Sequence, residues 1–238
     1  MKKCKKQPKE NKETNAVKYT IMQRVNMQLT PNQQLYVNAM NNKHLAVVIA
    51  TGPSGTGKTL LATHVALNKV ISRDYERLVI TRPAVTVGGE AHGFLPGSLT
   101  QKMDPYMQPV IDYINASKQS CKKTVEICPL SHMRGRTFDD TVVIADEMQN
   151  STTSQFKMLL TRLGNNSKLI ITGDMHQSDR EENGLLDFIQ RYNKWMDSIS
   201  DEQKRKTCFR HTPLYFEDVK RSATVREALE IYETTSLN

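Results

Sequence analysis

The chain has 238 residues, a formal net charge of +8 and 38% hydrophobic residues, values that suit a soluble globular protein with a sizeable core. Its longest apolar run spans residues 45–50, which is far too short for a membrane span, so no membrane partner is expected. Four cysteines without a C-x-x-C pair show no disulfide framework and favour a reducing, cytoplasmic compartment.

The positive charge is concentrated at the amino terminus. Residues 1–20 hold seven lysines against Glu10 and Glu13, a local charge of +5 that leaves +3 for the rest. With little apolar content, residues 1–20 are expected to form a basic disordered arm, and residues 21–238 a single folded domain. Attraction to nucleic-acid phosphates and simple solubilisation are equally compatible with such an arm.

The first element expected in the folded part is a helix that runs to about residue 42. Thr30 can cap this helix, Pro31 suits its first position, and Gln33 can complete a capping box. Residues 45–50 then form a continuous apolar run, which is typical of a strand buried on both faces of a parallel sheet.

Residues 52–59 match the pattern G-x-x-x-x-G-K-[ST] in full, and a helical pattern follows over residues 60–71. Glycines let the backbone curl around phosphate oxygens, and the start of the following helix adds partial positive charge. A nucleoside triphosphate with Mg²⁺ is therefore expected here, with Lys58 on the phosphates and Thr59 on the metal. The expected nucleotide-binding residues are Gly52, Pro53, Ser54, Gly55, Thr56, Gly57, Lys58 and Thr59.

Further apolar runs predict the rest of a parallel sheet. Residues 77–81 resemble a second buried strand, which completes a right-handed strand, helix, strand crossover with residues 45–50. Residues 88–109 are rich in glycine and proline and are expected to form a surface excursion with short helices. Strands are also expected over residues 141–145 and 168–172, which together predict an α/β fold with a parallel sheet sandwiched between helices.

Helices are expected after the later strands. Thr152 starts one helix through a capping box, and Gly164 can end it. A second helix is expected over residues 184–196, a last strand within residues 209–216 and a closing helix over residues 225–232.

Two carboxylates directly follow residues 141–145, at the sheet edge where open α/β sheets bind ligands. Asp146 is expected to hold Mg²⁺. Glu147 is expected to orient and deprotonate a water molecule that attacks the γ-phosphate, which favours hydrolysis over storage of the nucleotide.

Two other groups of residues allow more than one interpretation. In a doubly wound sheet, Gln177 lies where an amide can contact the γ-phosphate or its attacking water, although its surroundings also suit an ordinary turn. Arg134 and Arg136 could hold a phosphate or cap neighbouring carbonyl groups. Sequence spacing does not decide between these roles.

Seven motifs in the same order resemble the PhoH-like phosphate-starvation-inducible ATPase family. They are Gly-Pro-Ser-Gly-Thr-Gly-Lys-Thr at 52–59, Arg-Pro-Ala-Val at 82–85, Gly-Phe-Leu-Pro-Gly at 93–97, Met-Arg-Gly-Arg-Thr at 133–137, Asp-Glu-Met-Gln-Asn at 146–150, Leu-Thr-Arg-Leu-Gly at 160–164 and Thr-Gly-Asp-Met-His-Gln at 172–177. The resemblance covers roughly residues 29–235 and is strongest to short, single-domain versions, including those found in viruses. Residues 216–221 look like the family's carboxy-terminal arginine motif.

The resemblance implies a P-loop NTPase with a RecA-like core, similar to one motor domain of superfamily-one helicases. It implies ATP and Mg²⁺ as ligands, hydrolysis linked to RNA or single-stranded nucleic acid, and a ring-shaped homo-oligomer such as a hexamer. By position in the motifs, Gln33 would read the adenine and Arg221 would be an arginine finger. The implied catalytic residues are Lys58, Glu147, Gln177 and Arg221.

Two other functions are compatible with the same residues. A nucleotide-gated interaction module would bind ATP with negligible turnover, and a small-molecule kinase would use the same phosphate loop. The kinase gives no role to Gln177. The aromatic residues are dispersed along the chain, so no stacking platform for nucleic acid can be identified from the sequence.

Overall fold

The computed structural model describes residues 28–84, 124–179 and 181–220, and the single positions 224, 227 and 231. Several predictions made above concern other residues and are not tested by it. These are the basic arm over residues 1–20, the excursion over residues 88–109, the role of Arg221 and most of the closing helix over residues 225–232.

A six-stranded parallel sheet forms the centre of the described part, in the order β3-β2-β4-β5-β1-β6. Its strands are β1 (Val47–Thr51), β2 (Arg77–Thr81), β3 (Val125–Ile127), β4 (Thr141–Ala145), β5 (Lys168–Gly173) and β6 (Phe209–Pro213). Because all strands point the same way, the residues that follow β1, β4 and β5 meet at one edge of the sheet.

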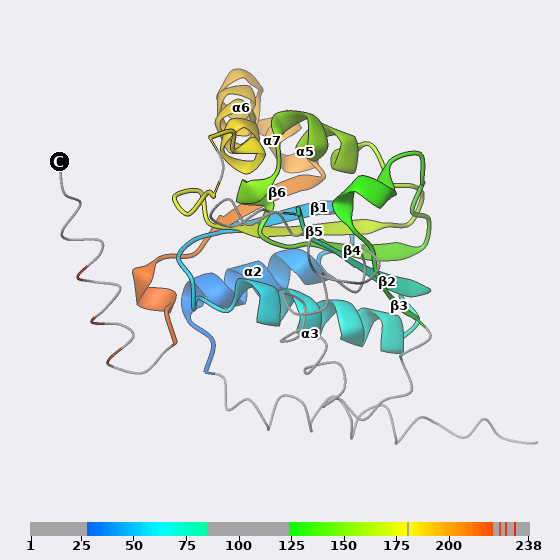
Figure 1. Cartoon of the computed structure of the whole chain (residues 1–238), viewed down its shortest axis with the longest axis horizontal. Helices are drawn as coiled ribbons and strands as arrows, with labels where there is room; N and C mark the ends of the chain where they lie inside the picture. Colours follow the sequence, from blue (N-terminus) through cyan, green and yellow to red (C-terminus); the bar gives the residue numbers. More distant parts are fainter. Residues whose placement is uncertain are drawn as a thin grey trace, which may run out of the picture.

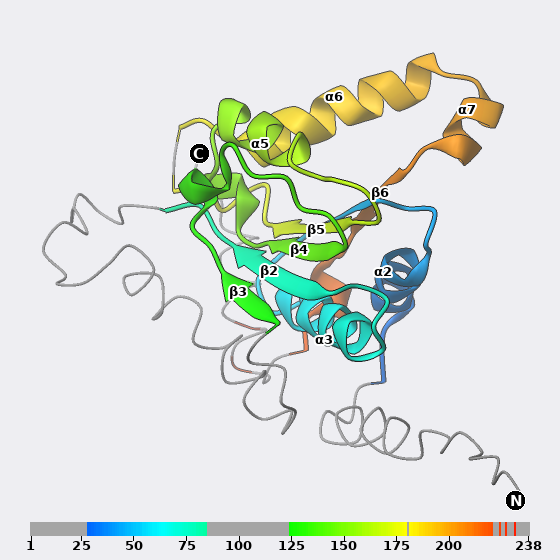
Figure 2. The ribbon, with the colours of Figure 1, turned by 90° about the vertical axis from the view of Figure 1, so that its right-hand side faces the viewer.

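Helices cover both faces of this sheet (Figure 1). The lower layer in that view holds α2 (Pro31–Asn41) and α3 (Lys58–Ile71), and the upper layer holds α5 (Thr153–Leu160) and α6 (Gly184–Ser198). Figure 2 shows α6 running outward to the short helix α7 (Asp201–Lys206) before the chain returns to β6. The three layers confirm the α/β fold of P-loop NTPases that the sequence predicts.

Two hydrophobic cores lie on opposite sides of the sheet, since neighbouring side chains of a strand point to opposite faces. In β1, Val48 and Ala50 belong to the core between the sheet and the helices α2 and α3. Val47 and Ile49 belong to the core between the sheet and the helices α5 and α6. The continuous apolar run of the sequence is thus explained by burial on both faces.

The predicted capping boxes begin α2 and α5. Thr152 accepts a hydrogen bond from the backbone of Gln155, whose side chain accepts one from Thr152 in return. The expectation that α5 continues to Gly164 is wrong, because the helix ends at Leu160. The chain after it pairs instead with Phe138, whose carbonyl accepts a hydrogen bond from the Gly164 backbone.

The last predicted strand lies within its expected span of residues 209–216. β6 ends at Pro213, the backbone N–H of Leu214 makes one more hydrogen bond to β1 at the carbonyl of Thr51, and the chain then turns into the short 3-10 helix η6 (Phe216–Asp218). Two further 3-10 helices, η4 (Leu130–Met133) and η5 (Met148–Asn150), precede and follow β4. Among the helices of the described ranges, none has the length and hydropathy needed to cross a bilayer.

Candidate nucleotide-binding site

The loop between β1 and α3 is curled in the way that phosphate binding requires. Gly52, Gly55 and Gly57 have φ angles of 146°, 87° and 83°, a range that favours glycine over other residues. Gly57 also begins α3, whose first turn has no acidic residue and no side-chain cap. The amide groups at this helix start are therefore suited to an anion.

Lys58 lies over this loop in a buried position. Its Nζ donates hydrogen bonds to the carbonyl oxygens of Gly52, at 2.6 Å, and Pro53, at 2.8 Å. Burial lowers the pKa of Lys58, while the nearby carboxylates of Asp174 and Glu147 act in the opposite direction. The ammonium thus contacts the phosphate loop directly, while the acids that follow β4 and β5 are near enough to act on its pKa.

Thr59 and Asp146 are brought into direct contact across 87 residues of sequence. The Thr59 hydroxyl donates to Asp146 Oδ1 at 2.7 Å, and the Thr172 hydroxyl donates to the same oxygen. Asp146 is only 5% exposed. A hydroxyl and a carboxylate are the hard oxygen donors that Mg²⁺ accepts alongside phosphate oxygens, so this pair fits the expected metal.

Other metal sites find little support in the described ranges. Within them, no group of three or more His, Cys, Asp or Glu side chains is arranged to hold a metal ion. A magnesium ion held by one carboxylate, one hydroxyl and phosphate oxygens needs no such group.

Glu147 has an unusual backbone conformation. Its φ and ψ angles are 54° and 42°, in the left-handed region that few residues other than glycine adopt. One of its carboxylate oxygens accepts a hydrogen bond from the side-chain amide of Gln149. Strained residues of this kind are concentrated at functional sites, where the surrounding structure holds them in place.

The segment after β5 packs against the segment after β4. The backbone N–H of Asp174 donates to the Gln149 side chain at 3.1 Å, and Asn150 exchanges two hydrogen bonds with Asp179. Gln177 lies in this segment and is exposed. The structure therefore brings the predicted sensor segment next to the segment that carries Glu147.

Gln33 lies on the other flank of the phosphate loop, with 3% of its surface exposed. Its amide nitrogen donates to the carbonyl oxygens of Thr56 and Asp218, and its amide oxygen accepts from the backbone of Thr30. These contacts connect α2 to the phosphate loop and to the segment after β6. The expected contact between Gln33 and adenine stays a prediction.

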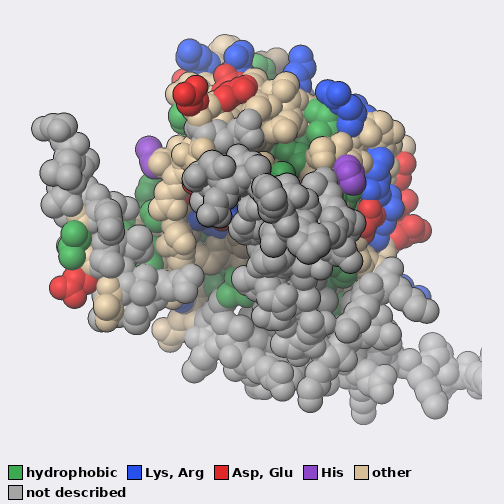
Figure 3. Space-filling view, viewed as in Figure 1, with side chains coloured by type: hydrophobic (Ala, Val, Ile, Leu, Met, Phe, Trp, Pro, Cys, Tyr) green, Lys and Arg blue, Asp and Glu red, His purple; other side chains and the backbone are tan. Residues whose placement is uncertain are grey.

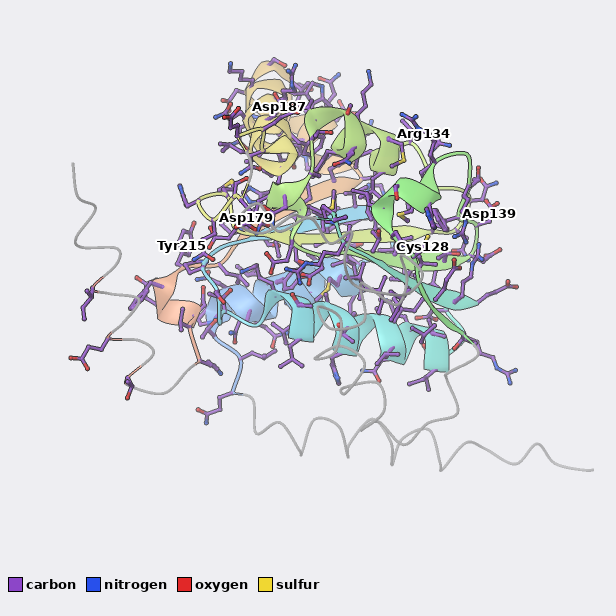
Figure 4. The ribbon with its side chains drawn as sticks, viewed as in Figure 1. Cys128, Arg134, Asp139, Asp179, Asp187 and Tyr215 are labelled. Atoms are coloured by element: carbon purple, nitrogen blue, oxygen red, sulfur yellow. The ribbon has the colours of Figure 1, made fainter. Side chains whose placement is uncertain are left out.

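The arginines upstream of β4 lie elsewhere. Arg136 forms a bidentate ion pair with Glu126, and its guanidinium lies 4.8 Å from the centre of the Phe138 ring. In Figure 4, Arg134 is well separated from Asp179 and Tyr215, which lie toward the edge where α3 begins. Arg136 thus contacts the edge strand β3, which three strands separate from β1 and the phosphate loop that follows it.

Sequence reasoning missed several polar residues of the site. Thr172, Asp174 and Gln149 all lie within motifs quoted for the family resemblance, but their types alone do not indicate what they contact. The partner of each lies in or next to the segment that follows a neighbouring strand, so only the order of the strands reveals it.

Comparison with known proteins gives one consistent result. A family model described as "PhoH-like protein" matches residues 26–233. The PhoH-like protein of Bacillus subtilis (strain 168) is 40% identical over 214 residues, which cover 86% of this chain and 63% of that protein. Protein PhoH of Escherichia coli (strain K12) is 42% identical over 171 residues, which cover 67% and 48%. The chain thus spans roughly half to two thirds of the length of these relatives.

Among solved structures, the Pif1 helicase from Candida albicans matches with a TM-score of 0.38 and 16% sequence identity. The match covers 79% of this chain and 40% of the helicase.

Proposed function

The chain belongs to the PhoH-like family. From this membership and the geometry of the phosphate loop, we propose that it binds ATP with Mg²⁺ and hydrolyses ATP at the bond to the γ-phosphate. The observation that most supports the proposal is the hydrogen bond between Thr59 and Asp146. It pairs the hydroxyl of the phosphate loop with an acid at the end of β4, which is the donor set of a magnesium-dependent nucleotide site.

ATP binding would use the phosphate loop and the side chain of Lys58. The backbone amides of residues 52–59 would surround the phosphates, and the Lys58 ammonium would exchange the carbonyls of Gly52 and Pro53 for phosphate oxygens. Thr59 and Asp146 would hold the Mg²⁺, which supplies neutralisation of the phosphate charge when bound.

Hydrolysis would depend on Glu147 and Gln177. Glu147 would accept a proton from the attacking water, and Gln177 would contact that water or the γ-phosphate. Arg221 of a neighbouring subunit would neutralise charge that grows during the reaction. The contacts between the segments after β4 and β5 support the pairing of Glu147 with Gln177.

The assembly and partners are further parts of this proposal. We expect a single domain over residues 21–238, a cytoplasmic ring of identical subunits, and RNA or single-stranded nucleic acid as a partner. In Figure 3, basic and acidic side chains are mixed over α6, so the basic residues 1–20 are the stronger candidate for electrostatic attraction. Nucleic-acid affinity should then fall steeply with added salt when those residues are present.

Phosphate release from ATP tests the catalytic proposal. Glu147→Gln should lower turnover by about 100-fold or more while ATP affinity persists, since it removes the proton acceptor and not the phosphate contacts. Lys58→Ala should lower both the turnover and the affinity for ATP. Glu202→Gln is a matched control, because this α7 glutamate is 71% exposed and should keep parental turnover.

Two results would contradict the proposal in different ways. Undiminished turnover in Glu147→Gln would remove Glu147 from the reaction. Parental turnover no faster than that of Lys58→Ala, together with clear ATP affinity, would instead favour a nucleotide-gated interaction module.

Measurement of mass with and without a non-hydrolysed ATP analogue tests the assembly. A ring predicts a mass that is a multiple of the 27.1 kDa chain, and Arg221→Ala should keep that mass while turnover falls. A monomer under both conditions would leave the arginine finger without a neighbouring site and would contradict its role.

A further inference from the structure

Gln149 connects the ends of two neighbouring strands through its side-chain amide. Its Nε2 donates to Glu147 Oε2 at 2.5 Å, and its Oε1 accepts from the backbone N–H of Asp174 at 3.1 Å. The side chain belongs to η5 and is 2% exposed. Both ends of the amide are therefore hydrogen-bonded. The nitrogen binds Glu147 just after β4, and the oxygen binds Asp174 just after β5.

The surroundings fix the orientation of this amide. A Cβ atom on Gly173 would lie only 2.7 Å from Gln149 Oε1, so the glycine leaves the space that the amide oxygen occupies. The backbone of the same residue is held as well, since the Ser178 hydroxyl donates to the backbone carbonyl oxygen of Gln149 at 3.2 Å. Because the oxygen end is anchored on Asp174, the NH₂ end is directed at Glu147.

This contact has a chemical consequence for Glu147. A glutamate side chain with no partner samples several rotamers, whereas a hydrogen bond to one carboxylate oxygen restricts them. The other oxygen then has a defined position from which it can accept a proton.

We propose that Gln149 is a positioning residue for the hydrolysis of ATP, which holds the Glu147 carboxylate in place by anchoring it to the backbone of Asp174, directly after β5. The inference rests on the proposed function, because it assigns Gln149 to the reaction that Glu147 performs. Gln149 does not itself touch the reacting atoms.

Gln149→Met tests the proposal, since methionine has a similar length and volume but no amide. We expect kcat for ATP to fall by about 10- to 100-fold, in line with a misplaced reacting group, while KM and the affinity for a non-hydrolysed analogue stay within about threefold. In the Glu147→Gln background the same change should lower kcat by less than about threefold, because the two residues act as a unit.

Gln155→Met is the matched control. It makes the same substitution in the half-buried Gln155 of α5, whose amide oxygen accepts a hydrogen bond from the backbone of Thr152 in the capping box and takes no part in the connection between Glu147 and Asp174. The control should unfold at a lower temperature and keep kcat within about threefold of the parent. If Gln149→Met does not fold, Gln149→Asn replaces it, since its amide is one methylene too short to reach both partners.

Several outcomes would overturn the inference. Parental or increased kcat in Gln149→Met would show that the amide does not assist Glu147. A full additional loss of kcat in the Glu147→Gln background would show that Gln149 does not act through Glu147. An equal loss of kcat in Gln155→Met would indicate a purely structural role for Gln149. Absence of ATP hydrolysis by the parent chain would contradict the proposed function, and this inference with it.

Discussion

Lys168 is a charged side chain enclosed by the protein at the start of β5. It is 1% exposed, and its ammonium donates to the carbonyl oxygens of Asn42 and Leu45. Burial, with a smaller effect of nearby Lys69, lowers its pKa from 10.5 to about 8. Between these two pKa values the unfolded chain binds more protons than the folded chain, so this residue makes stability rise with pH.

Urea denaturation of the parent chain and Lys168→Met measures this effect. Between about pH 7.5 and about pH 9.5 the parent should gain roughly 1–2 kcal/mol of unfolding free energy relative to the variant, because the folded lysine loses its proton over this range. Lys157→Met is the control, since Lys157 is exposed on α5 and should show no such gain. A difference between parent and Lys168→Met that does not change with pH would contradict the lowered pKa.

Individual residues of the site could be predicted where a motif fixes the chemistry. The sequence predicts that Asp146 meets the phosphate loop, and the structure joins Asp146 to Thr59, the residue after Lys58, by a hydrogen bond. The partners of Lys168 and Gln149 could not be predicted in this way. Those side chains bind backbone groups of other elements, and a backbone group carries no signature in the sequence.

At the scale of elements, the capping box of α5 gives a direct test of helix stability. Thr152 Oγ1 accepts from the Gln155 backbone at 3.1 Å, and the Gln155 side chain accepts from the Thr152 backbone at 3.0 Å. Thr152→Ala should lower the unfolding free energy by about 1 kcal/mol, since it leaves a backbone donor at the helix start without its partner.

Thr153→Ala is the control for this change. Thr153 is the first residue of the same helix, and its replacement should alter the unfolding free energy by less than about 0.5 kcal/mol. Urea denaturation of both variants measures the two changes in unfolding free energy. Equal effects of the two substitutions would show that the box does not stabilise α5.

Strands and helices were predictable where burial dictates the residue pattern. β1, β2, β4 and β5 are apolar runs covered on both faces. Their ends lie within one residue of the predicted spans, except that β1 starts two residues later than predicted. β3 was not predicted, because its three residues are half-buried at the sheet edge and include Glu126. α7 was not predicted either, since it is short and buries none of its residues.

At the scale of the whole molecule, the segment after β6 connects the start of α2 to the phosphate loop. Asp218 is 1% exposed and accepts hydrogen bonds from Thr30, Asn32 and the backbone of Tyr215. Two residues later, the backbone N–H of Lys220 donates to the carbonyl oxygen of Gly55. The start of α2, the phosphate loop and this segment therefore form one hydrogen-bonded unit.

Asp218→Ala should disrupt this unit. The substitution leaves the donors on Thr30, Asn32 and Tyr215 without their acceptor in a partly buried position, so the unfolding free energy should fall by about 1–3 kcal/mol. Glu217→Ala, which changes an exposed acid in the same 3-10 helix, should change it by less than about 0.5 kcal/mol. Urea denaturation of the two variants should separate them clearly, and similar losses would contradict the role of Asp218.

At this scale, the order of the strands in the sheet could be predicted only in part. The strand, helix, strand crossover through α3 follows from the sequence pattern, as does the parallel direction. The position of β6 beside β1, and the contact between Asp218 and Thr30 across 188 residues, depend on how distant segments pack. No local pattern of residues specifies them.

A structure of the chain with Mg²⁺ and a non-hydrolysed ATP analogue would test the nucleotide site most directly. We predict that Lys58 Nζ moves from the carbonyls of Gly52 and Pro53 to the phosphate oxygens, and that the cation lies between the Thr59 hydroxyl and Asp146. A nucleotide bound away from the phosphate loop, or a Lys58 ammonium still on those two carbonyls, would contradict it.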